Sequence, residues 1–278
     1  MLGKLMKHEL RYTSRVCLPA LAIMLGVVVI GRLFTAVIAG AVSYDMQIVL
    51  ESMSIIGNVF LLAGAAWVIL ILLAVRFYRN LTRDEGYLMF TLPVKPSQLI
   101  LSKLLTSYIW YFAAGVMLMI SLAVSLIGTA LLAEITSEAV LMDMEIIGDV
   151  ISEHMSQYTG KFVPFVILLV LSMLLSPFMA ILMLYASIAT GQLVFPKNRL
   201  LGAVLSYFGF NFLMQTVTSL FSVPFTISIN SMMMSDDLGY ILTNYNLMLV
   251  ISLLISLLFT VTFFLVTNYI FTKRLNLE

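Results

Sequence analysis

The chain has 278 residues, of which 62% are hydrophobic and only 10% are charged, and its formal net charge is +1. Soluble domains usually carry about 25% charged residues, so this composition excludes a soluble globular protein and indicates an integral membrane protein. A single cysteine, Cys17, excludes an intrachain disulfide and a cysteine-based metal cluster, and the two histidines, His8 and His154, lie far apart in the sequence. We therefore expect no metal site in this chain.

The first 15 residues are too charged to cross a bilayer. Leu2, Leu5, Met6 and Leu10 recur near helical spacing, whereas the basic residues fall mainly between them. This pattern predicts an N-terminal amphipathic helix on the cytoplasmic membrane surface. A cleaved signal peptide is the alternative, but the apolar run that follows is longer than the roughly 7–15 residues of a signal-peptide core.

Six apolar runs follow, each long enough for the ~20 residues that a spanning helix needs. They cover approximately residues 16–41, 55–76, 104–132, 163–190, 200–223 and 246–271. With both termini inside the cell, every Lys and Arg except Arg32 and Lys161 lies in a cytoplasmic segment, and most acidic residues lie outside. Because Lys and Arg accumulate on the cytoplasmic side, this bias predicts an all-α membrane protein of six transmembrane helices, forming one domain over residues 1–278.

Two of the outer segments are long. Residues 133–162 combine an apolar face with acidic residues, which predicts an amphipathic helix on the outer surface. The EF-hand spacing with its central Gly is absent, so a solvated acidic face is favoured over a calcium site. Residues 224–245 are only weakly polar, and both a free loop and short helices that dip into the outer leaflet fit them.

Polar residues within the spans are the candidates for a translocation path, because polar groups inside a membrane are costly and often functional. Asn211 and Gln215 share one face of the fifth span, and Ser252 and Ser256 form a stripe on the sixth. Interhelical hydrogen bonding and close helix packing are the alternatives for these two pairs. Arg32 lies toward the end of the first span, where its side chain can reach the interface without a functional role.

The cytoplasmic stretch 76–103, between the second and third spans, carries more distinctive features than any other hydrophilic segment. It holds five basic residues, an acidic pair, a short amphipathic segment and two prolines. The chain contains no GxxxxGK[ST] phosphate loop, no GxSxG and no HExxH. We therefore expect no enzyme activity and no nucleotide or other cofactor bound by this chain itself.

This stretch resembles the cytoplasmic segment of ABC-2 type transporter permeases, whose pattern runs roughly E-x-G-T-L-E-x-L-L-x-x-P-V-S. The similar residues are Glu85-Gly86-Tyr87-Leu88-Met89-Phe90-Thr91-Leu92-Pro93-Val94, then Pro96-Ser97, Leu99 to Leu101 and Lys103. The N-terminal KLMKHELRYTSR is similar to the connecting helix of the family, and permeases of Gram-positive bacteria are especially similar. Two features depart from the family: Tyr87 replaces the usual Thr, and 133–162 is longer than in compact members.

The resemblance implies the permease subunit of an ATP-driven ABC transporter in the bacterial plasma membrane, with both termini cytoplasmic. Two permeases, identical or different, pair within the membrane lipids, and two copies of a separate ATPase subunit carry ATP and Mg²⁺; no nucleic acid partner is implied. The implied ATPase-docking coupling helix comprises Asp84, Glu85, Gly86, Tyr87, Leu88, Met89, Phe90, Leu92 and Pro93. We expect export of a hydrophobic or amphipathic substrate, such as a peptide antibiotic, a lipid-like molecule or a drug.

Two other functions compete with this one. A transport-silent membrane scaffold or sensor would use the same cytoplasmic segment to recruit a partner. A secondary transporter is disfavoured, because paired intramembrane charges for ion coupling are missing from the predicted spans.

Overall fold

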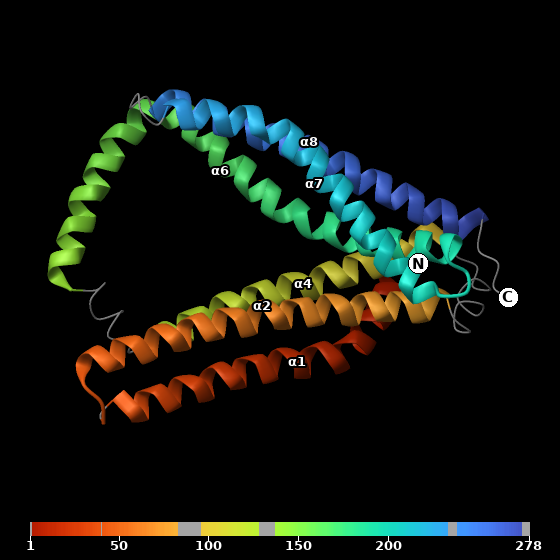
Figure 1. Cartoon of the computed structure of the whole chain (residues 1–278), viewed down its shortest axis with the longest axis horizontal. Coiled ribbons are helices and arrows are strands. Elements are labelled where there is room, and N and C mark those ends of the chain that lie inside the picture. Colours follow the sequence, from red (N-terminus) through yellow and green to blue (C-terminus); the bar gives the residue numbers. More distant parts are fainter. Residues whose placement is uncertain (1, 40, 83–95, 128–136, 233–237, 274–278) are drawn as a thin grey trace. The chain divides into compact units, whose positions relative to one another are not determined.

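The computed structural model describes residues 2–39, 41–82, 96–127, 137–232 and 238–273, which form helices and their short connections, with no strand among them (Figure 1). In chain order the helices are α1 Leu2–Ala39, α2 Tyr44–Thr82, α4 Pro96–Leu126, α6 Glu138–Val194, α7 Arg199–Met232 and α8 Leu238–Lys273. The predicted all-α fold is therefore confirmed over the described part of the chain.

Five helical stretches of the described residues are long and apolar enough to cross a membrane. They are Leu2–Ile38, Pro96–Leu126, Tyr158–Val194, Arg199–Ser228 and Gly239–Thr272. These stretches coincide with the first, third, fourth, fifth and sixth predicted spans, so a multi-pass membrane protein is confirmed. The second predicted span, 55–76, lies within α2 but is not among the five, and a total of six spans stays a prediction.

The helices are longer than the predicted spans. α1 has 38 residues and α6 has 57, or roughly 57 and 86 Å at 1.5 Å per residue, against a hydrocarbon thickness of ~30 Å. The N-terminal amphipathic segment is therefore continuous with the first span, and the described part of 133–162 is the first portion of α6. The described part of 224–245 extends α7 and α8, which is neither of the two arrangements we considered.

Prolines within the helices do not end them. Pro177 lies inside α6 and Pro224 inside α7. Proline lacks the amide that would donate to the carbonyl four residues earlier, which for Pro177 belongs to Met173. The Ser176 Oγ donates to that carbonyl instead, over 3.3 Å. A side-chain hydrogen bond thus replaces the backbone hydrogen bond that Pro177 cannot make.

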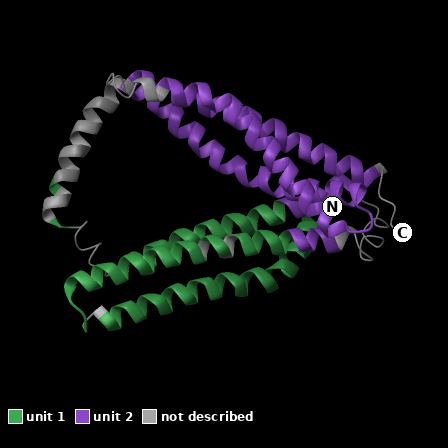
Figure 2. Cartoon of the chain, in the orientation of Figure 1, with its two compact units in different colours: residues 1–73, 105–151 green, residues 74–104, 152–278 purple. Residues whose placement is uncertain are grey.

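The chain folds into two compact units that alternate along the sequence (Figure 2). Unit 1 comprises Met1–Leu73 and Leu105–Ile151, and unit 2 comprises Ala74–Leu104 and Ser152–Glu278. The end of α2 and the start of α4 therefore belong to a different unit from the remainder of these two helices.

A hydrophobic core holds α1, α2 and α4 of unit 1 together. Its buried members are Cys17, Leu21, Met24, Val28, Ile69, Leu73, Trp110 and Ala114. On each helix these residues recur at helical spacing, so that one face is buried. The indole Nε1 of Trp110 also donates to the Thr13 Oγ1 over 2.7 Å, which satisfies the one polar atom of this ring and ties α4 to α1.

In unit 2, α6 and α7 meet backbone to backbone at a pair of glycines. A Cβ atom added to Gly191 would overlap the backbone of Gly202 and Ala203, and one added to Gly202 would overlap the backbone of Gly191. Small residues permit such close helix approach inside a membrane. The glycine pair therefore sets how α6 turns into α7.

α8 lies against both α7 and α6 within unit 2. It packs along α7, where the rings of Phe210 and Phe263 have centroids 5.3 Å apart. Toward the start of α8, the Lys161 Nζ donates to the Gly239 carbonyl over 2.9 Å. The Asn246 Nδ2 donates back to the Lys161 carbonyl over 2.8 Å, so one residue of α6 fixes the first turns of α8.

We expect Gly191→Ala to destabilise the protein by about 1–3 kcal/mol, because the new methyl group forces two backbones apart. Gly209→Ala on α7 is the matched control, since nothing lies within 4 Å of a Cβ there. That change should be neutral or stabilising, because alanine favours helix over glycine by up to ~1 kcal/mol. Thermal unfolding of the two variants in detergent measures this. An equal change in unfolding temperature for both variants would contradict the close approach of the α6 and α7 backbones at Gly191.

Candidate functional site

The nine residues expected to form the coupling helix lie outside the described residues, within 83–95. Both flanks of that segment are described: α2 ends at Thr82 and α4 begins at Pro96, and both flanks belong to unit 2. Proline suits the first position of α4, because its fixed φ is helical and its missing amide has no helical partner there. The helix ends that hold this segment are therefore the candidate site.

The end of α2 is fixed by aromatic contacts. Phe77 is only 1% exposed and stacks on Tyr185 of α6, with centroids 3.7 Å apart and ring planes 6° apart. Its ring also meets Phe271 of α8 edge to face, at 5.7 Å and 82°. Such aromatic pairs contribute about 0.5–1.5 kcal/mol beyond the area that they bury. Phe77 therefore joins the end of α2 to α6 and α8.

The start of α4 is fixed by the same tyrosine. Leu99, Ile100 and Leu104 are buried, and the Tyr185 hydroxyl donates to the Lys103 carbonyl over 3.4 Å, a long hydrogen bond. We call Phe77, Lys103, Tyr185 and Phe271 the anchor cluster. Through it, both flanks of 83–95 contact one side chain of α6, and the α2 flank also contacts α8.

The four candidate path residues lie on the two helices that pack together, α7 and α8. Asn211 is half-buried and Gln215 is exposed on α7. Ser252 and Ser256 are half-buried on α8, and their hydroxyls donate to the carbonyls of Leu249 and Ser252, over 2.9 and 2.8 Å. The two serines thus bond to their own helix in this structure, and their role in a translocation path stays a prediction.

An open groove beside α8 is lined by Leu193, Leu265, Val266, Tyr269 and Ile270. Its lining is almost entirely apolar, so it offers few polar groups to orient a substrate. Among the described residues, no group of three or more His, Cys, Asp or Glu side chains is placed to hold a metal ion.

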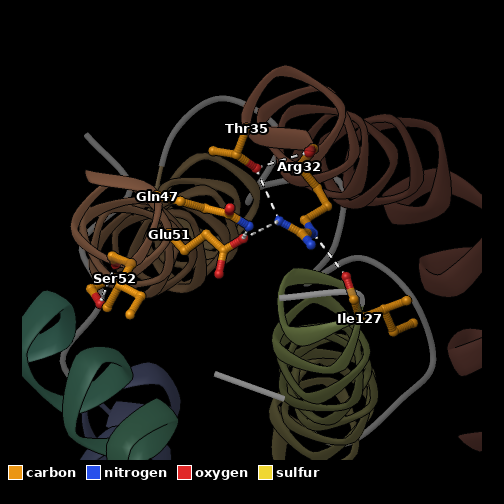
Figure 3. Close-up of polar contacts among 7 residues, drawn as sticks. Arg32, Thr35, Gln47, Glu51, Ser52 and Ile127 are labelled. Atoms are coloured by element: carbon orange, nitrogen blue, oxygen red, sulfur yellow. Dashed lines mark hydrogen bonds and ion pairs between the residues drawn. The ribbon is translucent and has the colours of Figure 1, made fainter. Parts of the chain in front are cut away.

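A polar cluster that the sequence analysis missed lies in unit 1 and centres on Arg32 of α1 (Figure 3). The Arg32 Nε donates to the carbonyl of Ile127, just past the end of α4, over 2.8 Å. Its Nη1 donates to the Thr35 Oγ1 over 3.1 Å and lies 3.9 Å from the Glu51 Oε1 of α2. The Gln47 Nε2 donates to the same Glu51 oxygen over 3.1 Å. We call these five residues the Arg32 cluster.

The Arg32 cluster is favourable for two physical reasons. The last carbonyls of a helix lack partners within the helix and carry partial negative charge, so a guanidinium at the end of α4 is stabilising. The Glu51 side chain is 2% exposed and that of Arg32 14%, so each charge compensates the other where water is scarce. One side chain of α1 thereby contacts both other helices of the unit 1 core.

The sequence did contain a signal for this pair. Arg32 precedes the turn at 41–43 by about as many residues as Glu51 follows it, and two antiparallel helices would place them level. We began the second span at residue 55 and assigned Glu51 to an outer segment. Because α2 already begins at Tyr44, Glu51 lies on a helix opposite Arg32, and the two side chains form a charge pair that we did not predict.

We expect Phe77→Ala to cost about 3–5 kcal/mol, because it removes a buried ring that contacts two aromatic partners. Phe212→Ala is the matched control: its ring is 75% exposed, so the change should cost no more than about 0.5 kcal/mol. Equilibrium unfolding in mixed micelles with increasing dodecyl sulfate measures both. Similar costs for the two variants would show that the anchor cluster does not hold the end of α2.

Comparison with known proteins assigns no family to this chain: no protein-family model, no curated protein and no solved structure matches it.

Proposed function

We propose that this chain is the membrane-spanning permease subunit of an ATP-driven ABC transporter, with six spans that include α2 and with residues 84–93 as its coupling helix. The observation that carries the proposal is the anchor cluster. A coupling helix can transmit movement to the transmembrane helices only if both of its ends are in firm contact with them. Here Tyr185 contacts the flanks on both sides of 83–95, at Phe77 and at Lys103.

The anchor cluster suggests the direction of coupling. When two ATPase subunits close on ATP and Mg²⁺, the docked segment is displaced with them. Tightly packed interiors transmit such a displacement because they resist compression. Phe77 and Tyr185 then carry the movement into α6, and Phe271 carries it into α8, on which the candidate path residues Ser252 and Ser256 lie.

The distribution of charge in unit 2 supports a cytoplasmic position for the anchor cluster. Of the Lys and Arg residues of unit 2 that the structure describes, six lie at the end of α2, the start of α4, the turn from α6 to α7 and the end of α8, at positions 76, 79, 103, 197, 199 and 273. The exception is Lys161, which lies beside Gly239 at the start of α8. Since Lys and Arg accumulate on the cytoplasmic side of membrane proteins, we assign the end of α8 to that side, and Lys4, Lys7, Arg11 and Arg15 at the start of α1 assign the N-terminus to it as well.

The proposed partners follow from this assignment. Two ATPase copies bind beneath the chain, and a second permease, identical or different, lies beside it within the lipids. Broad apolar faces, with side chains such as Val37 and Phe60 largely exposed, suit contact with lipid and with a second permease. We propose export of a hydrophobic or amphipathic molecule in the bacterial plasma membrane.

The coupling helix is tested by purifying the tagged full-length chain from its native membranes and measuring Mg²⁺-ATP hydrolysis in the eluate. Replacing Leu88, Met89 and Phe90 together by alanine should reduce copurified ATPase activity at least about tenfold, because the apolar anchors of a docking helix carry most of its affinity. The matched control replaces Phe208, Phe212 and Leu213 of α7, which are exposed apolar residues outside the coupling segment.

Hydrolysis that copurifies equally with both triple variants would exclude 84–93 as the docking element. If wild-type chain carries no ATPase at all, the permease assignment itself fails. An ATPase that copurifies with the chain but drives no export would instead favour a membrane scaffold or sensor.

A further inference from the structure

Buried polar side chains with and without partners lie at different ends of unit 1. At one end, which we call the Trp110 end or the apolar half, lies the hydrophobic core of α1, α2 and α4, and the polar residues buried there, Thr13, Thr106 and Ser107, all have interaction partners. On α2, Asn58 lies about three helical turns before Ile69, and on α4, Ser121 lies about two turns after Ala114, so each continues the buried face of its helix. Beyond them lies the Arg32 cluster, which marks the opposite end, the Arg32 end.

Two side chains in this polar half are buried without a hydrogen-bond partner among the described residues. Asn58 is 6% exposed and Ser121 is 0% exposed. Neither the Asn58 Nδ2 nor the Ser121 Oγ has a hydrogen-bond partner there. The amide of Asn58 lies beside α1, since a Cβ on Gly31, the residue before Arg32, would be 3.9 Å from its Oδ1. Burying a donor without a partner is destabilising, so these atoms are better satisfied in a state that gives them an acceptor.

The helices of unit 1 can separate more easily at one end of the unit than at the other. The Trp110 end is closed by apolar packing, and opening it would expose that surface to water. The Arg32 end is held by hydrogen bonds and an ion pair, which water can replace at small net cost. Because Arg32 contacts both α2 and α4, breaking its contacts releases two helices from α1 at once.

We propose that Asn58 and Ser121 belong to a polar compartment inside unit 1 that opens at the Arg32 end, with the Arg32–Glu51 pair as its latch. In the closed state, described here, the latch is formed and the two donors are unpaired. In the open state the latch is broken, and water or another oxygen acceptor enters and accepts from Asn58 and Ser121. This compartment lies in unit 1, whereas the anchor cluster lies in unit 2, and it does not depend on the proposed transport function.

The proposal is tested by thiol labelling of the full-length chain in open membrane fragments, which expose both sides of the membrane. Ser121→Cys is the reporter inside the compartment, and Ala114→Cys, on the same helix in the apolar half, is the reporter outside it. Both are made with Cys17→Ala, so that each chain has one cysteine. The probe is a charged, membrane-impermeant methanethiosulfonate.

Adding Glu51→Gln should raise the labelling rate at position 121 about tenfold or more, because a charge-assisted contact is lost while the side-chain shape is kept. The rate at position 114 should not change. Asp45→Asn is the matched control on α2, since Asp45 is exposed and outside the Arg32 cluster, and it should leave both rates unchanged.

Two outcomes overturn the proposal. An unchanged rate at position 121 in the Glu51→Gln chain means that the pair is not a latch. Equal acceleration at positions 114 and 121 means that the pair holds the whole unit together. If Cys17→Ala prevents folding, amide hydrogen exchange of the wild-type and Glu51→Gln chains replaces labelling, and only faster exchange around 121, and not around 114, supports the compartment.

Discussion

Satisfaction of hydrogen bonds within each helix is the constraint on which the rest of this structure depends. In an apolar environment no solvent is present to accept from free amides, so the backbone bonds to itself in long helices. Hydroxyl side chains follow the same rule: Thr190, Ser256 and Thr267 each donate to the carbonyl four residues earlier. Polar contacts between helices are then informative, because they show where two helices are fixed against each other.

The two units use different interactions to hold their helices. In unit 1, the Trp110–Thr13 hydrogen bond and an apolar core hold one end, and the Arg32 cluster holds the other. In unit 2, a glycine pair sets the approach of α6 and α7, while rings and buried aliphatic residues surround Tyr185. Helices held by hydrogen bonds and an ion pair can separate where water replaces these contacts, whereas closely packed rings and backbones transmit a displacement. This difference is why we place a compartment in unit 1 and force transmission in unit 2.

Hydropathy located the helices well but not their lengths. Five predicted spans coincide with long apolar helices, because local composition decides whether a segment prefers lipid. The helices α1, α2 and α6 begin more than ten residues before the predicted spans that they contain. Charged residues outside the membrane can still continue a helix. Pro177 and Pro224 likewise remain inside helices, and at Pro177 the Ser176 hydroxyl bonds to the carbonyl that lacks an amide partner.

By itself, the sequence determined an all-helical membrane protein and the approximate position of its apolar helices. Only the tertiary structure decided which residues meet. Nothing local in the sequence distinguishes Phe77 or Tyr185, which are buried, from Phe212, which is exposed, because lipid and protein interior accept an aromatic ring equally well. The partner of Arg32 depended on where α2 begins and on the antiparallel placement of two helices, and both follow from packing over a distance that composition does not encode.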